Sequence, residues 1–233
     1  MSPRRGLRAF FLVCVVCFGA VSTAPAQNNP AFYYSITNAA AKANLQFATE
    51  AAKLLGVTAD PDWAHVASNI PILKFADGVT REHATYNGEG IKQADVNLLA
   101  YPLKEVTDPK AIKKDLNYYE TRVPNEGTPA MTQAVFSLLY ARLGDADKAH
   151  HWFRDAYIPN LNPPFRVIAE TKGGTNPYFA TGAGGIIQAM LMGFGGLEIT
   201  PQGITQLKSV LPAKWKSLKI TGVGPEKKTF VVK

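Results

Sequence analysis

The feature that most limits the fold of this chain is a series of helical segments, most of which carry their own start or stop signal. Apolar residues recur at three- and four-residue intervals over residues 35–55, and Gly56 follows as a stop signal. Asp60–Pro61 and Asp108–Pro109 each place a capping side chain before a proline at the first helical position. These pairs predict helices that run to about Ile70 and to about Tyr119.

The next segments predict a helical hairpin. Thr128–Pro129 opens a segment with apolar residues at helical spacing that Gly144 closes, so we expect an amphipathic helix there. Asp145 then begins a companion helix that runs to Tyr157, and so short a connection is typical of an αα-hairpin. Residues 184–193 form a further apolar helix.

Beyond the last helix the pattern changes to short strands. Residues 197–200 and 217–221 alternate in the manner of strands, and proline and glycine lie between them. The sequence shows no βαβ alternation, no phosphate-binding glycine loop before a helix and no heptad repeat. We therefore expect an all-α fold to about residue 195 with a small β appendage.

The N-terminus has the composition of a secretory signal. Arg4, Arg5 and Arg8 precede an apolar run over residues 9–20, and Ala24–Pro25–Ala26 forms a cleavage motif before Gln27. The apolar run is shorter than the roughly 20 residues of a membrane-spanning helix, although an uncleaved anchor is the alternative. We expect a signal peptide over 1–26, a mature chain without membrane attachment, and a secreted or periplasmic location.

Cysteine and charge exclude several classes of site. Cys14 and Cys17, the two cysteines of the chain, both lie in the signal, so the mature chain has neither a disulfide nor a thiolate metal site. The net charge of +7 falls to +4 once the three arginines of the signal are removed, since no acid is lost. The lysines are scattered rather than gathered in a stripe, which gives no support to nucleic-acid binding. His150 and His151 are adjacent and face different directions on a helix, so we expect no metal ion and no cofactor.

Two motifs carry residues suited to a sugar. Lys92 and Gln93 lie next to each other and supply donors and an acceptor for vicinal hydroxyls. Glu170 is a lone carboxylate ahead of the glycine-rich run 173–185, where we expect the backbone to approach a ligand closely. The alternatives are an exposed glutamate beside a flexible loop and a helix start with a solvated lysine. Glu120 is a weaker candidate for sugar contact, and Trp63 and Trp152 are expected in the core.

The two motifs and several other segments resemble glycoside hydrolase family 65. They occur in the same order as in the family, along most of the mature chain. The matching segments are Thr37–Ala40, Ile91–Val96, Leu98–Leu103, Tyr118–Glu120, Pro129–Thr132, Gly193–Gly196 and Leu211–Pro212. The resemblance implies the C-terminal half of an (α/α)₆ toroid over residues 27–196, with a β-rich segment over 197–233. It also implies an inverting α-glucoside hydrolase of the branch that contains collagen-type glucosidases and kojibiose hydrolases, with Glu170 as the general base and Lys92 and Gln93 in the glucose subsite.

The general acid that the resemblance implies has no counterpart in this chain. Counting back from Thr37–Asn38 to its position reaches Ala26 and Gln27, and no Asp or Glu precedes Glu50. We expect half a toroid to expose apolar seams, and therefore to associate with another copy, to pair with a complementary N-terminal half, or to be only marginally stable. The alternative functions are a non-catalytic remnant that binds sugar weakly and an all-α scaffold with no sugar role. The sequence alone predicts weak activity or none.

Overall fold

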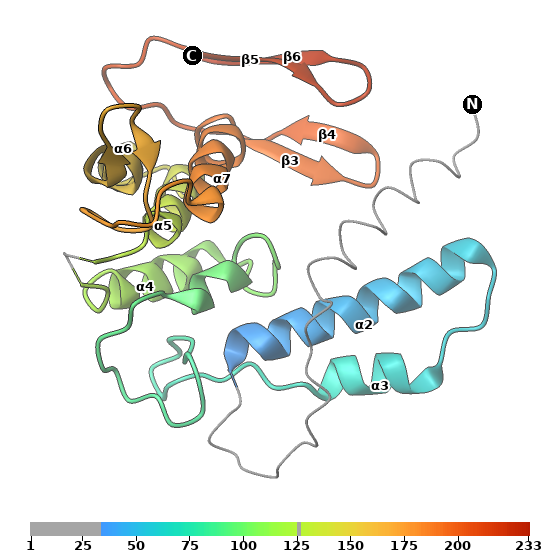
Figure 1. Cartoon of the computed structure of the whole chain (residues 1–233). Helices are drawn as coiled ribbons and strands as arrows, with labels where there is room; N and C mark the ends of the chain where they lie inside the picture. The colour runs from blue at the N-terminus through green and yellow to red at the C-terminus, as the bar shows by residue number, and fades with distance from the viewer. Residues whose placement is uncertain (1–33, 125–126) are drawn as a thin grey trace. The chain divides into compact units, whose positions relative to one another are not determined.

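The computed structural model describes residues 34–124 and 127–233 (Figure 1). The expected signal peptide and its cleavage point lie outside the described residues. Six α-helices are present in the described ranges: α2 Ser35–Leu55, α3 Pro61–Asn69, α4 Pro109–Tyr119, α5 Ala130–Arg142, α6 Ala146–Tyr157 and α7 Ala180–Gln188. Short 3₁₀ helices cover Asp95–Leu99 (η2) and Ile158–Asn160 (η3), and a π-helical segment, η4, covers Ala189–Phe194. None of the described helices is both long enough and apolar enough to cross a membrane.

The predicted starts of α3, α4 and α6 are confirmed, because they depend on local capping. The Asp60 carboxylate accepts the N–H of Asp62 (2.9 Å), and the Asp108 carboxylate accepts the N–H of Ala111 (3.0 Å). Asp145 caps α6 in the same way. Each cap satisfies a backbone donor that has no partner within its own helix.

The expectation that α5 is amphipathic is wrong. Ten of its thirteen residues are buried, and they occur on every side of the helix. Helix α5 packs against α6 on one side and against α7 and η4 on another, so it is the central helix of this region. A helix surrounded by other helices needs no polar stripe.

The glycine-rich run 173–185 is only partly a loop, because α7 begins at Ala180 rather than at the expected Gly184. A Cβ on Gly182 would lie 2.9 Å from the Cβ of Ala130, and one on Gly185 would lie 3.1 Å from the Cβ of Ala134. These two glycines therefore allow α7 to pack closely on α5 and do not face a ligand, which corrects the prediction for them.

Within residues 34–124 and 127–233, the strands form three separate two-stranded antiparallel sheets. The expected strand over 197–200 is confirmed as β3 Leu197–Thr200, which pairs with β4 Gly203–Gln206. The expected strand over 217–221 is confirmed as β5 Leu218–Val223, which pairs with β6 Lys228–Val232. A hairpin of β1 Leu161–Asn162 and β2 Val167–Ile168 interrupts the helical part, and the helical pattern did not predict it. A helical body with a small β part is thus confirmed.

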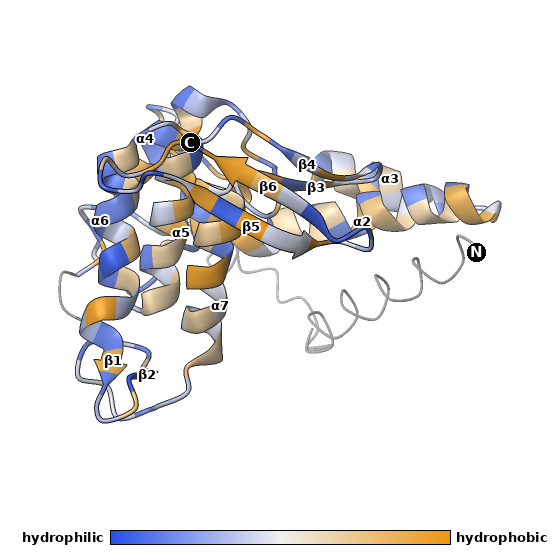
Figure 2. Cartoon of the chain, turned by 90° about the horizontal axis from the view of Figure 1, so that it is seen from above, coloured by the Kyte–Doolittle hydropathy of each residue, from blue (hydrophilic) through white to orange (hydrophobic). Residues whose placement is uncertain are grey.

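The core of the described residues is rich in aromatic side chains. The largest fully buried ones are Tyr86, Tyr119, Tyr140, Phe136 and Phe194. At the C-terminal end of α2, by contrast, the apolar Leu54 is 76% exposed. Figure 2 colours the ribbon at this end of α2 as hydrophobic. Trp63 and Trp152, expected in the core, are half-buried.

Candidate functional site

The structure brings two of the three predicted site residues into direct contact. The Nζ of Lys92 lies 2.8 Å from Oε1 of Glu170 and donates a hydrogen bond to it, across 78 positions of sequence. Lys92 comes from the segment before η2, and Glu170 comes two residues after β2. Gln93 is half-buried beside Lys92 in the chain.

Backbone hydrogen bonds on both sides hold the main chain of Glu170. The N–H of Ala169 donates to the carbonyl of Asn160 (2.8 Å), which lies at the end of η3. The N–H of Ala130, at the start of α5, donates to the carbonyl of Glu170 itself (2.8 Å). Asn160 is buried and its side-chain amide donates to the carbonyl of Ala156 (3.0 Å). The peptide of Glu170 is therefore fixed between α5 and the end of α6.

The loop after Glu170 returns to contact its carboxylate. The Nδ2 of Asn176 donates to Oε2 of Glu170 (3.1 Å), so each carboxylate oxygen has a donor. Gly174 makes this return possible, since a Cβ there would lie 3.0 Å from both Oδ1 of Asn176 and the carbonyl oxygen of Thr171. Gly174 therefore helps to position a partner of Glu170, unlike Gly182 and Gly185, which serve the packing of α7 on α5.

These donors favour the ionised form of Glu170. The hydrogen bond from Lys92, followed by that from Asn176, holds the pKa of the Glu170 carboxyl below its ordinary value. The Glu170 side chain is 26% exposed and that of Lys92 is 61% exposed, so water reaches both. A solvent-accessible carboxylate that stays ionised has the protonation state that a general base requires.

A buried carboxyl that sequence analysis did not identify supports the segment with Lys92 and Gln93. The Glu82 carboxylate accepts the N–H of Val96 (3.2 Å) and is 5% exposed. Burial raises the pKa of Glu82 to about 7, and it also raises the pKa of its neighbour Asp95. The one signal in the sequence was a glutamate shortly before a motif, which is too common to be informative.

Glu120 differs from expectation, because it is neither solvated nor placed at the Lys92–Glu170 pair. Its carboxylate accepts hydrogen bonds from the Tyr140 hydroxyl and from Lys148, and its side chain is 19% exposed. Over the described ranges, no three His, Cys, Asp or Glu side chains cluster so as to hold a metal ion.

Comparison with known proteins gives a consistent family. Residues 79–166 match the model of the glycosyl hydrolase family 65 central catalytic domain. A kojibiose hydrolase of Mucilaginibacter mallensis is 77% identical over 199 residues, which cover 85% of this chain and 29% of that protein. A protein-glucosylgalactosylhydroxylysine glucosidase of Dictyostelium discoideum is 38% identical over 203 residues, covering 84% of this chain and 28% of that protein. A Candida glabrata acid trehalase named as periplasmic or secreted is 36% identical over 193 residues, which cover 75% of this chain and 16% of that protein.

A solved structure shows the same fold. A putative kojibiose phosphorylase from human microbiome aligns over 81% of this chain and 31% of its own, with a TM-score of 0.59 and 14% identity. The chain thus spans less than a third of the length of each of these proteins. The match to the family model and the identity of these relatives, taken together, show that the chain belongs to glycosyl hydrolase family 65.

Proposed function

We propose that this chain is the part of an inverting α-glucoside hydrolase that activates the attacking water. Glu170 is the general base, and Lys92 and Gln93 bind the hydroxyls of the glucose that is released. The observation that carries the proposal is the carboxylate of Glu170, which is reached by water and held ionised by Lys92 at 2.8 Å and Asn176 at 3.1 Å.

The chemistry requires a second carboxyl group. In an inverting glycosidase the base deprotonates a water on one face of the sugar while an acid, roughly 6.5–9.5 Å away, protonates the leaving oxygen. We assign that acid to a polypeptide segment outside residues 1–233, either in a longer form of this chain or in a separate one. The same proposal takes residues 27–196 as part of an (α/α)₆ toroid and 197–233 as its β-rich appendage.

Water, rather than phosphate, is the proposed nucleophile. The segment that leads into α5 has few donors left for a phosphate oxygen, because the Thr128 hydroxyl donates to the carbonyl of Pro124 and the Ala130 N–H donates to Glu170. Pro129 has no N–H at all. The relatives named kojibiose hydrolase and glucosylgalactosylhydroxylysine glucosidase are hydrolases by name, which agrees with this choice.

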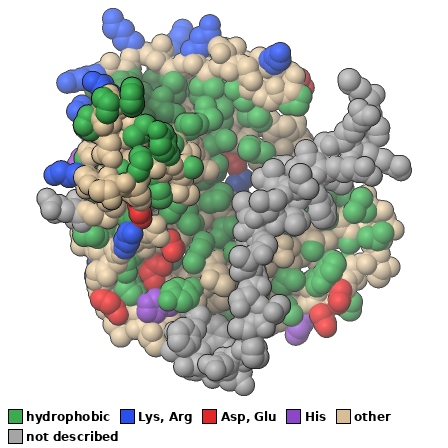
Figure 3. Space-filling view, in the orientation of Figure 1, with side chains coloured by type: hydrophobic (Ala, Val, Ile, Leu, Met, Phe, Trp, Pro, Cys, Tyr) green, Lys and Arg blue, Asp and Glu red, His purple; other side chains and the backbone are tan. Residues whose placement is uncertain are grey.

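A second candidate is a half-domain that acts only with a partner. Apolar side chains are exposed on the hairpin of α2 and α3, among them Leu54 at 76%, Leu55 at 56% and Val57 at 58%, and Figure 3 shows hydrophobic side chains at the surface there. Such a surface favours association with a complementary N-terminal half or with another copy of the chain. We also propose that the chain is exported, because its N-terminus has the composition of a secretory signal.

The test is glucose release from kojibiose, trehalose and a glucosylgalactoside. We expect little turnover by the purified chain and strong turnover once the unmatched part of the Mucilaginibacter kojibiose hydrolase is fused to it, with β-glucose as the first product seen by NMR. In the fusion, Glu170→Gln should abolish turnover, whereas Glu50→Gln, at an exposed position of α2, should leave it unchanged. Robust turnover by the chain alone would contradict the assignment of the acid, and full activity of Glu170→Gln would contradict that of the base.

A further inference from the structure

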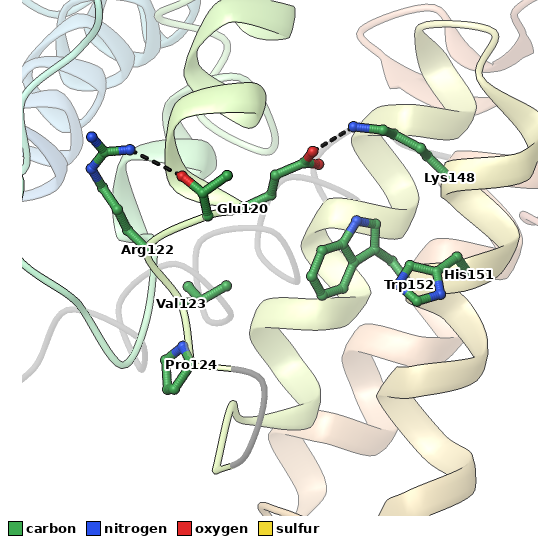
Figure 4. A pocket seen from close by; sticks show the side chains of 8 residues that line it. Glu120, Arg122, Val123, Pro124, Lys148, His151 and Trp152 are labelled. Atoms are coloured by element: carbon green, nitrogen blue, oxygen red, sulfur yellow. Dashed lines mark hydrogen bonds and ion pairs between the residues drawn. The ribbon is translucent and has the colours of Figure 1, made fainter.

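A cavity lies between the end of α4 and α6, and its lining includes neither Lys92 nor Glu170. Its volume is about 710 Å³, within the range of roughly 300–1,000 Å³ typical of small-molecule sites. One wall is the segment 120–124 that follows α4, and the other is formed by α6. Figure 4 shows Glu120 and Arg122 on the first wall and Trp152 and His151 on the second.

The α6 wall offers a fixed aromatic ring. The Trp152 indole stacks on Phe136 with ring centroids 4.9 Å apart and an angle of 26° between the planes. Phe136 is completely buried in α5, so Trp152 is anchored to the core although it is itself half-buried. The His151 ring adjoins the indole at 5.2 Å. The apolar surface of this wall is therefore in place before any ligand arrives.

The opposite wall offers polar groups that are held equally firmly. Glu120 accepts hydrogen bonds from Lys148 and from the buried Tyr140 hydroxyl, and burial followed by the contact with Glu120 raises the pKa of Tyr140 so that it stays a donor. The Arg122 guanidinium lies 3.4 Å from the centroid of the Tyr118 ring and donates to the Tyr118 carbonyl (2.7 Å). These contacts leave donors on Lys148 and Arg122 and lone pairs on Glu120 for a ligand.

The balance of charge selects the class of ligand. Lys148 is already neutralised by Glu120, and the Arg122 guanidinium already donates to the carbonyls of Gly88 and Tyr118 and to the Thr121 hydroxyl. An anion in the cavity would in addition face the Glu120 carboxylate. A purely apolar ligand would desolvate three charged groups without replacing their hydrogen bonds. A neutral sugar has hydroxyls that both donate and accept, together with an apolar face that suits an indole ring. We propose that this cavity is a second saccharide site, separate from the candidate catalytic one, which binds a glucose-sized ring against Trp152.

The experiment follows the indole N–H signals of the three tryptophans by NMR as kojibiose is added to the full chain. The Trp152 signal should shift in a saturable way, whereas those of Trp63 and Trp215, which do not line the cavity, should stay in place. The same shift should persist in a Lys92→Met, Glu170→Gln double variant, which removes the candidate catalytic pair. Failure of the proposed function would therefore leave this result intact.

Matched variants test the residues. His151→Ala should raise the saccharide Kd by about two- to tenfold, which corresponds to the loss of one hydrogen bond or ring contact. The control is His65→Ala, on the exposed face of α3, which should leave the Kd unchanged. Trp152→Phe, which keeps stacking on Phe136, should weaken Kd by a similar factor, with calorimetry as the readout. The proposal is overturned if the spectrum of a folded protein shows no Trp152 shift up to roughly 50 mM kojibiose, well above a millimolar Kd. It is equally overturned if the shift disappears in the double variant, or if inorganic phosphate alone produces it.

Discussion

Replacement of Glu82 by glutamine should change how the stability of the protein depends on pH. The folded protein holds the Glu82 proton up to a pKa of about 7, because burial disfavours the charge, whereas the unfolded chain releases it near the ordinary 4.5. Between these values the folded state binds more protons, so the free energy of unfolding falls as pH rises. Each pH unit in this window costs about 1.4 kcal/mol, which gives a loss of about 3 kcal/mol by pH 8 as an upper figure.

Glutamine removes this loss and keeps the structure, because its side-chain oxygen can still accept the Val96 N–H. Urea unfolding at pH 4 and pH 8 measures the free energy of unfolding. Between these two pH values, that of the Glu82→Gln variant should rise by up to about 3 kcal/mol relative to that of the wild type. Glu50→Gln is the control, since Glu50 is exposed and should show no such gain. A difference between Glu82→Gln and wild type that stays constant from pH 4 to pH 8 would refute the reasoning.

Two further predictions concern α7 and the candidate base. Gly185→Ala should destabilise the protein by about 1–3 kcal/mol, because its Cβ would lie 3.1 Å from that of Ala134 on a packed helix, as read from thermal unfolding. Gly184→Ala, where a Cβ meets nothing within 4 Å, should instead be neutral or stabilising by up to about 1 kcal/mol, and equal effects of the two changes would contradict the packing argument. Lys92→Met should raise the pKa of the Glu170 carboxyl, since the lysine hydrogen bond is the main cause of its depression, and an NMR titration of that carboxyl that shows no rise would contradict this.

The parts of the fold that could be predicted from sequence are those with local causes. The starts of α3, α4 and α6 depend on an aspartate at the cap, and two of them also depend on the proline that follows. The hairpin of α5 and α6 follows from two helices with a short connection. The family resemblance placed Lys92 and Glu170 in one site, which no local pattern could do across 78 positions, and the direct contact between them was found only in the structure.

The remainder depends on contacts between distant segments. The burial of α5 on every side is an exception, because its own residues carry the signal: apolar side chains occur all round the helix, with no polar stripe. Gly182 and Gly185 resemble loop residues by propensity, and only their contact with α5 shows why a helix accepts them. Glu82 and the Trp152 cavity likewise arise from side chains brought together by packing, with no motif to mark them.

The hydrogen bond from the Ala130 N–H to the Glu170 carbonyl has a consequence for protein engineering. It ties the orientation of the candidate base to the first turn of the central helix, so an insertion or deletion in residues 127–129 would displace Glu170 without altering any residue that contacts it. Libraries intended to change linkage preference would therefore do best to vary the exposed positions of residues 171–178 other than Asn176, which holds the Glu170 carboxylate, and to keep the length of the α5 entry fixed. Variation at the helix entry would instead be selected against through loss of the base.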